Sequence, residues 1–296
     1  MDITNIDRGQ IQWERMLPEE FRQAVARLPV AFLPLGTVEW HGEHNALGLD
    51  SLKAHELLVR AAKKAGGGVV HPPVYGGMGG LDKAATVIME PELAWENLLL
   101  RQWLEQLCYE FHRNGFRAIV IVTGHYGHNQ QMVVREAAAR MTERLRIPVL
   151  GTPEYWLALD EGYLGDHAGI GETSLLWHLH PDLVAIERIR NDPDYGVDGI
   201  IEAHSSPELG RRYAETIVNR ISTLAKRMLA WDDSLLDRYI HSERAILQAQ
   251  ARGWRRIGPW EFWRHIGGSD FVRYGQWLVE ERFEQIARTA AKLGQS

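Results

Sequence analysis

Side chains that bind divalent metals gather in one short segment of the sequence. Segment 36–50 (GTVEWHGEHNALGLD) carries five of them, namely Glu39, His41, Glu43, His44 and Asp50. Imidazole nitrogens and carboxylate oxygens are the ligands that zinc and similar divalent ions take in proteins. In extended backbone Glu39 and His41 lie on the same face, and the glycines of the segment permit turns that bring Asp50 back towards them. A solvated polar loop is the alternative, but so many ligands in one segment favour a metal site.

Two later segments carry further residues of the same types. Segment 123–129 (TGHYGHN) contains His125, a candidate ligand for which a packing or helix-capping role is equally consistent with this segment alone. Segment 166–174 (DHAGIGETS) contains Glu172 at an expected helix start, where stabilising the helix dipole is the alternative role. In the same segment His167 is suited to carry a proton near neutral pH. Both segments are therefore candidates to complete the site.

The elements that must position these residues follow from the apolar pattern. Apolar runs typical of buried strands occupy residues 29–36, 68–74, 117–124 and 147–152. Helical patterns cover residues 51–65, 92–114, 129–146 and about 172–178, and a further helix starts at Ser206. This alternation predicts an α/β fold with a mainly parallel sheet between helical layers. Ligands bind beyond the carboxyl ends of the strands in such sheets, where two of the three segments lie.

The overall composition excludes several classes of protein. The chain has 296 residues, 45% of them hydrophobic, and a net charge of −6 without long charged runs. Such a chain buries a sizeable core, and its mild acidity argues against nucleic-acid binding. The single cysteine, Cys108, excludes a disulfide framework and fits a reducing compartment. With no apolar run long enough for a membrane span and no visible secretory signal, we expect a cytoplasmic protein without membrane or nucleic-acid partners.

The last part of the chain differs from the rest in its aromatic content. Seven rings lie close together there, at Trp254, Trp260, Phe262, Trp263, Phe271, Tyr274 and Trp277, interleaved with arginines. We expect an α/β domain over residues 1–230 and a helical extension over residues 231–296, packed on that domain or on a neighbouring subunit. Rings exposed on a monomer would form an apolar patch that soluble monomers rarely tolerate. Residues after about Trp254 are therefore expected to pack across a subunit boundary or to cap a neighbour's pocket.

Four segments of the chain resemble motifs of one known family. These segments are LPLGTVEWHGEHNALGLDS (33–51), TGHYGHN (123–129), HAGIGETS (167–174) and SPELGRRYAE (206–215). They are similar to the signature motifs of the creatininase family of metal-dependent amidohydrolases and occur in the family's order. Each motif alone is weak, but the four together span about residues 30–220 and are specific.

The resemblance implies a three-layer α/β/α sandwich that holds a dinuclear metal centre of zinc, manganese or iron ions. Carried over residue by residue, Glu39 and His125 would hold one divalent ion and His41 the other. Asp50 would bridge the two ions. The resemblance also implies a homo-oligomer, typically a hexamer.

This sequence departs from the family pattern in two places. Where the family's name-giving enzyme has a glutamate ligand, this chain has Gly127, and Glu172 is the best replacement for that ligand. Tyr126 matches a substrate-contacting tyrosine, and His167 matches the catalytic histidine. Segment 76–91, which lines the substrate pocket in the family, keeps none of the usual motif. The resemblance therefore implies the metal ligands without identifying the substrate.

The expected chemistry is hydrolysis of a C–N amide bond in a small molecule, cyclic or linear. Water between two divalent ions loses a proton far below its bulk pKa, and a metal ion can polarise the amide carbonyl. The leaving nitrogen needs a proton, which His167 can supply. A deformylase or peptidase with the same metal centre is the alternative enzyme, and a catalytically silent binding protein of the same fold is the alternative outside enzymes.

Overall fold

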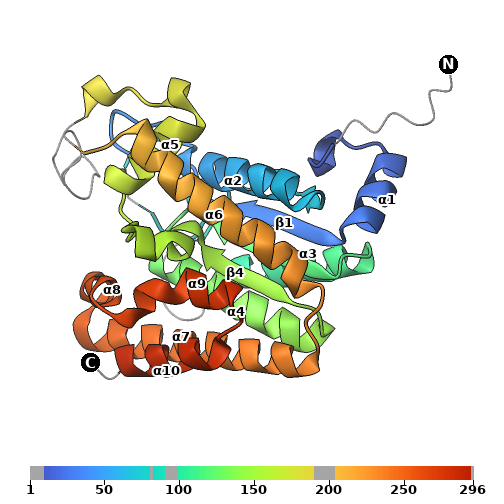
Figure 1. The fold of residues 1–296 in the computed structure, drawn as a ribbon. Helices are drawn as coiled ribbons and strands as arrows, with labels where there is room; N and C mark the ends of the chain where they lie inside the picture. Colours follow the sequence, from blue (N-terminus) through green and yellow to red (C-terminus); the bar gives the residue numbers. More distant parts are fainter. Residues whose placement is uncertain (1–9, 81–82, 91–98, 190–203, 295–296) are drawn as a thin grey trace, which may run out of the picture.

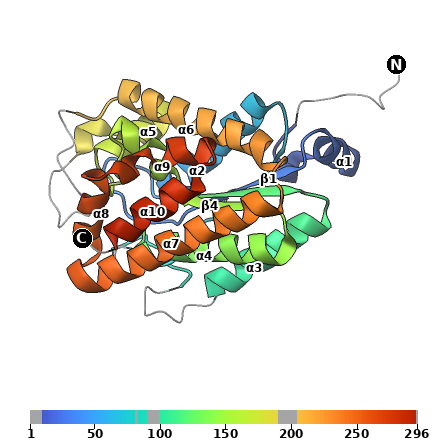
Figure 2. The same ribbon diagram turned by 60° about the horizontal axis from the view of Figure 1, so that its bottom comes forward.

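The computed structural model of the chain describes residues 10–80, 83–90, 99–189 and 204–294. Its centre is a parallel sheet with the strand order β2-β1-β3-β4, formed by β1 (Val30–Leu35), β2 (Val69–Val70), β3 (Ala118–Thr123) and β4 (Val149–Pro153). Leu35 pairs with Thr123, so β1 and β3 end level with each other. Helices cover both faces of this sheet (Figures 1 and 2).

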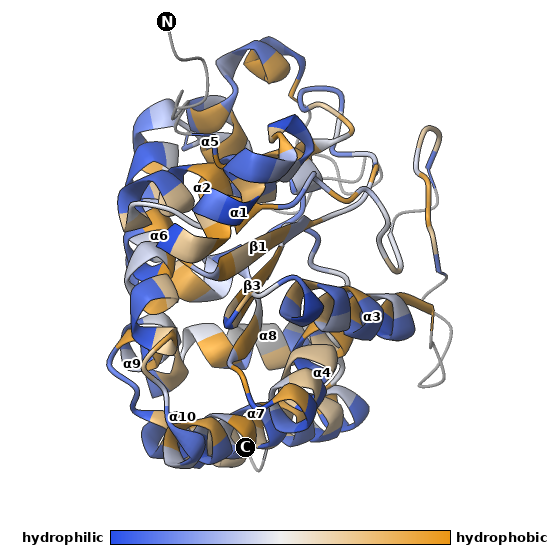
Figure 3. Ribbon diagram, turned by 90° about the vertical axis from the view of Figure 1, so that its right-hand side faces the viewer, coloured by the Kyte–Doolittle hydropathy of each residue, from blue (hydrophilic) through white to orange (hydrophobic). Residues whose placement is uncertain are grey.

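The two faces of the sheet build two hydrophobic cores. Strands β1 and β3 are buried along their whole length, and alternate residues point into opposite cores. One face packs against α2 (Leu49–Ala65), α5 (Ile170–Leu179) and α6 (Pro207–Met228). The other packs against α1 (Pro18–Arg27), α3 (Leu99–Arg113) and α4 (His128–Leu145). Figure 3 shows the strands as hydrophobic and the helices as mixed, as expected for strands buried between two helical layers. Helices on both faces of a parallel sheet confirm the three-layer sandwich.

Local chemistry explains where the elements depart from the expected ranges. Strand β2 is confined to Val69–Val70 because Pro72 and Pro73 cannot donate to a ladder, although Val74 still bridges to Leu35. Helix α2 begins at Leu49, two residues earlier than expected, which places Asp50 in its first turn. The expected helix over 92–114 is observed as α3, and residues 92–98 lie outside the described ranges.

The carboxyl-terminal part of the chain is helical, as expected. It forms α7 (Asp233–Ile257), α8 (Pro259–Gly267), α9 (Tyr274–Val279) and α10 (Phe283–Leu293). Helix α7 lies beside α4 and α10 (Figure 2), and Tyr239 Oη donates a hydrogen bond to the carbonyl oxygen of Val149 at 2.9 Å. Helix α7 therefore packs beside the edge strand β4. Within the described ranges, no helix is long and apolar enough to cross a membrane.

The aromatic rings of this part are buried in their own chain. Phe262, Phe271, Tyr274 and Trp277 are at most 4% exposed, and Trp254 packs against the ring of His128 on α4. These four rings are covered by their own chain and need no neighbouring subunit to bury them, whereas packing of the extension on a neighbouring subunit stays a prediction. Trp260 and Trp263 lie outside the side chains that the structure describes.

Candidate metal centre

The five predicted ligands meet at the carboxyl ends of β1 and β3. The loop after β1 supplies Glu39 and His41, and the first turn of α2 supplies Asp50. The loop after β3 supplies His125, and the first turn of α5 supplies Glu172. Each of the five is at most 4% exposed. The structure thus brings together residues that are up to 133 positions apart in the sequence.

Two glycines allow the start of α2 to approach both strand ends. A Cβ atom on Gly124 would lie 2.1 Å from the carbonyl oxygen of Asp50, and one on Gly36 would lie 2.4 Å from the backbone nitrogen of Ser51. Both distances are far below van der Waals contact, so any side chain at either position would push α2 away. The close approach is what places Asp50 between the two strands.

The ligand atoms form two groups that share Asp50. In the first group, His125 Nδ1 lies 3.0 Å from Glu39 Oε2 and 3.3 Å from Asp50 Oδ2. In the second, His41 Nε2 lies 3.1 Å from Asp50 Oδ1 and 3.7 Å from Glu172 Oε2. Within each group the ligand atoms lie within 4.8 Å of one another, as ligands of a common ion would. Asp50 offers a different oxygen to each group, which is the arrangement that a bridging carboxylate needs.

Backbone carbonyls fix which ring nitrogen of each histidine faces the carboxylates. His125 Nε2 donates to the carbonyl oxygen of Met78 at 3.0 Å, and His41 Nδ1 donates to that of Glu39 at 2.9 Å. A carbonyl oxygen can only accept, so in each neutral ring the other nitrogen carries the lone pair. Gln130 holds the Met78 segment by accepting from its backbone nitrogen at 2.6 Å. Lone pairs and carboxylates therefore face one another, an arrangement that requires a cation between them.

In the metal-free protein, protons supply that positive charge. Burial lowers the pKa of His41, but the carboxylates of Asp50 and Glu172 outweigh burial and raise it to about 9. Burial likewise lowers the pKa of His125, and Glu39 and Asp50 raise it well above its usual value. In the described part of the chain, His41 Nε2 and both carboxylate oxygens of Asp50 make no hydrogen bond of normal geometry. These buried atoms fit a metal ion, which a proton replaces poorly.

His167 lies directly beside the two groups and is partly exposed. Its ring stacks on that of His41, with the ring centroids 4.5 Å apart, and its Nε2 donates to the carbonyl oxygen of Trp40 at 2.8 Å. Burial and the neighbouring His41 hold the pKa of His167 below its usual value, so the ring is neutral and Nδ1 is the acceptor. His167 also forms a close group with Glu39 and His41. The geometry is consistent with a proton carrier and with a further ligand.

The hydroxyl group of Tyr126 makes hydrogen bonds with three side chains of the protein. It donates to Glu154 Oε1 at 2.5 Å and lies 2.6 Å from Tyr163 Oη and 2.8 Å from Lys53 Nζ. The side chain is buried, and burial raises the pKa of Tyr126 well above its usual value. Direct contact between this hydroxyl and a substrate would require one of these hydrogen bonds to break, so the placement favours a supporting role.

Two buried charged residues beside the ligands had no role in the sequence analysis. Lys53 follows Asp50 by one turn of α2, and its Nζ binds Glu172 and lies 3.0 Å from Glu154 Oε1. Glu154 follows directly on β4. The sequence contains a signal for each residue. Lys53 lies three residues after Asp50 and so shares its face of the helix. Glu154 follows the end of a strand, where site residues of parallel sheets commonly lie.

The lack of space around position 127 explains why this residue is a glycine. A Cβ atom there would lie 2.7 Å from His125 Nε2 and 2.8 Å from the carbonyl oxygen of Met78. Any side chain would therefore disturb the hydrogen bond that orients His125. The carboxylate of Glu172 reaches the group of His41 and Asp50 from α5 instead, as expected of a replacement.

Other polar residues of the motifs hold together the segments that carry the candidate ligands. His44 Nε2 lies 3.1 Å from both the carbonyl oxygen of Ala168 and Thr173 Oγ1, and so links the segment after β1 to the start of α5. Asp166 accepts from the backbone nitrogens of Gly171 and Glu172 at 2.6 and 3.0 Å and thereby caps α5. Glu43 is exposed and lies outside the two groups.

The described part of segment 76–91 lies against the loop that carries Glu39. The backbone nitrogen of Val87 donates to the carbonyl oxygen of Val38 at 2.8 Å, and a Cβ atom on Gly80 would lie 3.1 Å from Glu39 Oε1. Three neighbouring apolar side chains, those of Val87, Ile88 and Met89, are 62%, 38% and 37% exposed. Apolar surface therefore borders the ligand cluster.

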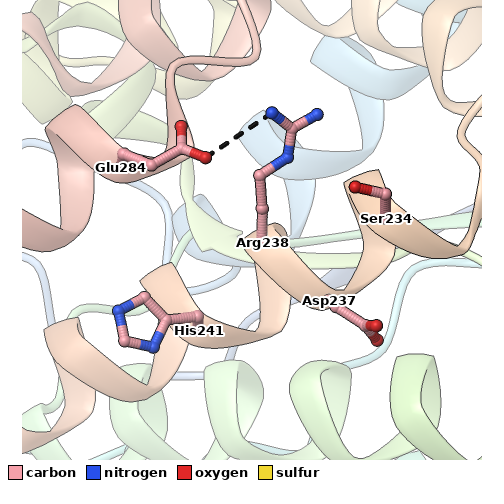
Figure 4. A pocket seen from close by; sticks show the side chains of 5 residues that line it. All are labelled: Ser234, Asp237, Arg238, His241 and Glu284. Atoms are coloured by element: carbon pink, nitrogen blue, oxygen red, sulfur yellow. Dashed lines mark ion pairs between the residues drawn. The ribbon is translucent and has the colours of Figure 1, made fainter.

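A surface hollow of about 490 Å³ lies away from the ligand cluster, on α7 and α10. It is lined by Ser234, Asp237, Arg238, His241 and Glu284, with Arg238 and Glu284 3.5 Å apart in an ion pair (Figure 4). None of these residues belongs to either donor group. The hollow is part of the exposed surface of two helices, whereas the candidate metal ligands lie at the ends of the sheet strands.

Comparison with known proteins agrees with the motifs. Residues 14–225 match the sequence profile of Creatininase, described as creatinine amidohydrolase. A creatinine amidohydrolase from Pseudomonas putida is 26% identical over an alignment of 204 residues, and the match covers 62% of this chain and 76% of that protein. A mycofactocin precursor peptide peptidase from Mycolicibacterium smegmatis is 27% identical over an alignment of 177 residues, and the match covers 57% of this chain and 65% of that protein. A crystal structure of creatininase shares the fold, with a TM-score of 0.64 and 24% identity over 74% of this chain and 98% of that one.

Proposed function

The chain belongs to the creatininase family of metal-dependent amidohydrolases, and we propose that it hydrolyses a C–N amide bond in a small molecule with two divalent metal ions. The observation that carries the proposal is Asp50, which turns one carboxylate oxygen towards each of two donor groups. A single ion would need only one of these groups. The buried excess of carboxylates around Asp50 supports a strongly charged occupant.

The residues that would hold the ions follow from the two groups. Glu39, Asp50 and His125 would hold one ion, and His41, Asp50 and Glu172 the other. When bound, such ions lower the pKa of water and polarise a carbonyl group. Zinc, manganese and iron suit these nitrogen and oxygen donors, and creatininase structures of similar fold are described as the Zn–Zn type and with Mn.

His167 would move the proton that hydrolysis requires. As water adds to the amide carbonyl carbon, Nδ1 of the neutral ring accepts a proton from it and then delivers that proton to the departing nitrogen. The hydrogen bond from Nε2 to the carbonyl of Trp40 and the stacking on His41 hold the ring in one orientation beside the donor groups and leave Nδ1 available. An amine is a poor leaving group until it is protonated, so this transfer is needed for the C–N bond to break.

The test is a substrate screen with metal-loaded protein. The full chain, loaded with zinc or manganese, would be assayed with cyclic amides, formamides and short peptides, with Asp50→Ala as the matched control. Turnover that disappears in the control supports the proposal. A chain that neither retains metal nor turns over any of these classes would instead be a catalytically silent protein of the same fold.

A peptide substrate is the second candidate, and the exposed apolar side chains beside Glu39 favour it. Val87, Ile88 and Met89 offer a surface for apolar side chains, which a small cyclic amide does not need. The similarity to a mycofactocin precursor peptide peptidase is consistent with this alternative. Comparing kcat/KM for short apolar peptides with that for cyclic amides and formamides separates the candidates. Replacing Val87 by Ser would lower only the peptide rate if this surface binds the peptide.

A further inference from the structure

The segment that carries His167 is covered by helices that follow the region shared with the family. Residues 154–169 join β4 to α5 and begin with the 3₁₀ segment η3 (Glu154–Glu161). The family match ends at residue 225, and helices α7 to α10 come after it. Figure 1 shows α9 beside the yellow-green η3, and the last residue of α8 contacts the same segment nearer to His167. Helices outside the matched region therefore contact the loop of the candidate proton carrier.

Aromatic rings of these helices hold η3 from the outside. Trp156 is buried, and its ring meets those of Phe271 and Tyr274 at nearly right angles, with each pair of centroids 5.2 Å apart. A Cβ atom on Gly275 would lie 3.0 Å from the Cα atom of Leu157, so α9 lies directly on the backbone of η3. Closely packed buried rings leave little room to shift. The first half of the segment is thus fixed by the carboxyl-terminal helices.

The second half of the segment has a backbone that its own residues do not favour. Gly165 and Ala168 are both left-handed, with φ angles of 78° and 53°. A residue with a Cβ atom seldom adopts this conformation, which persists only where the surroundings enforce it. On the inner side the carbonyl oxygen of Ala168 accepts from Thr173 Oγ1 at 3.0 Å, which ties the loop to α5. The conformation that presents His167 therefore depends on contacts with other elements.

The outer contact of this half comes from Gly267, the last residue of α8. A Cβ atom there would lie 3.0 Å from Leu164 Cδ1, so the backbone of α8 touches the side chain of Leu164. Leu164 lies three residues before His167 and is 46% exposed. It is therefore covered on one side only, and the side that is covered faces α8.

The corner between α7 and α8 (residues 253–267) is itself anchored. A Cβ atom on Gly253 would lie 2.1 Å from Phe262 Cδ2, so the two helices interlock and move together. The ring of Trp254 packs on that of His128, with the centroids 4.6 Å apart, and His128 begins α4 in the segment after β3. The α7–α8 corner thus contacts both the segment after β3 and the segment before α5, which are the two that meet at the site.

We propose that Leu164 is a positioning residue, through which the α7–α8 corner holds His167 at the reacting atoms. The hydrogen bond to Trp40 and the stacking on His41 orient the ring of His167, but they do not fix the backbone that carries it. Misplacing a reacting group by about 1 Å can lower a rate by about 10²-fold. The inference rests on the proposed function, in which His167 moves the proton.

The first test is kinetic and uses the metal-loaded full chain with the substrate that the screen shows to be hydrolysed fastest. Leu164→Ala removes the contact with α8, and the variant should fold because the side chain is half exposed. Its kcat should fall by about 10-fold or more, while KM and metal content stay those of the wild-type chain. Leu164→Met keeps the volume and the contact and should restore kcat.

Phe283→Leu is the matched control, because it trims a buried ring of the same carboxyl-terminal helices that packs on Trp231 and Tyr239 instead. It should lower Tm and leave kcat unchanged. An unchanged kcat in folded Leu164→Ala, or an equal loss of kcat in Phe283→Leu, would overturn the inference and leave the proposed function standing.

Hydrogen–deuterium exchange gives a second readout that needs no substrate. The backbone N–H of Ala168, next to His167, donates to Glu172 Oε2 at 2.8 Å and is therefore protected in the folded loop. Mass spectrometry of the peptide that contains it should show faster exchange in Leu164→Ala and unchanged exchange in Phe283→Leu. Unchanged exchange in both variants would overturn the inference. If the wild-type chain hydrolyses none of the substrates, the proposed function fails, and exchange alone decides whether the corner holds the loop.

Discussion

Buried charge occurs around Asp50 and around Arg135, and the two regions balance it in different ways. Arg135 on α4 donates to Glu243 Oε2 at 2.8 Å and to Tyr274 Oη and Thr152 Oγ1 at 3.2 Å each. Its guanidinium also lies 3.9 Å from the centre of the Trp156 ring. One cation meets one anion there. Around Asp50, by contrast, lie four buried carboxylates, those of Glu39, Asp50, Glu154 and Glu172, and the ammonium group of Lys53 contacts only the last two. Balance there depends on protons on His41 and His125 or on metal ions.

This difference in charge balance distinguishes the structural cluster around Arg135 from the candidate binding site around Asp50. Uncompensated buried charge is costly, so a protein retains it only where a ligand supplies the balance. The Arg135 cluster is balanced by its own chain and links α4, β4, α7 and α9. The cluster around Asp50 is balanced only when protons or metal ions enter. Residue types alone do not distinguish the two regions, but their charge balance does.

The largest expected effect comes from Asp50→Ala, which removes the residue shared by both donor groups. Activity should fall to background and at least one metal ion should be lost, because neither group is complete without Asp50. Assays of turnover and elemental analysis of the same preparation check this. Full turnover with two tightly bound ions in the variant would show that Asp50 is not a ligand.

His167→Ala should lower kcat by about 10²–10⁴-fold, the usual contribution of a general acid or base. Metal content should stay that of the wild-type chain, because the two donor groups that share Asp50 remain complete. Steady-state kinetics beside metal analysis measure both. Loss of metal in this variant would make His167 a ligand and remove its role as proton carrier.

Arg135→Met tests the balanced cluster. It leaves the carboxylate of Glu243 buried without its cation, so the free energy of unfolding should fall by about 3–5 kcal/mol. Metal affinity of the folded protein should not change. Chemical denaturation gives the free energy, and the double variant Arg135→Met with Glu243→Leu is the matched control. If the double variant is as unstable as the single one, uncompensated charge is not the cause.

The smallest effect is a dependence of stability on pH in the metal-free chain. The pKa of His41 is raised in the folded state, to about 9, above the usual 6.5. The stabilisation by its proton is therefore complete below pH 6.5 and is lost as the pH rises towards 9. The Tm of the chelator-treated protein should fall over this range, and the gain in Tm on adding metal should grow. A metal-free Tm that rises between pH 6.5 and 9 would contradict this.

Much of the centre could be predicted because its ligands combine a distinctive residue type with a position after a strand. Glu39, His41 and His125 follow the ends of β1 and β3, and Asp50 opens the next helix. Lys53 could not be predicted in the same way, since a lysine within a helix is nearly always exposed. Its burial depends on Glu154, which lies 101 residues further along the chain.

The aromatic carboxyl-terminal part shows a second limit of the sequence. Composition indicates that rings such as Phe271 and Tyr274 are buried, but packing within a chain and packing between chains require the same residue types. The structure shows that they pack within the chain. The homo-oligomer, the cytoplasmic location and the division of the chain at residue 230 stay predictions.

The level pairing of β1 with β3 has a consequence for the order of events during folding. The pairing joins Leu35 to Thr123, and forming it closes a long loop, which is a slow step in chain assembly. His125 follows one of these strands and Glu39 the other, so the donor group that contains both does not exist before the strands meet. Metal ions then cannot act as a template for the early chain. Added during refolding, they should leave the folding rate unchanged and slow only the unfolding rate.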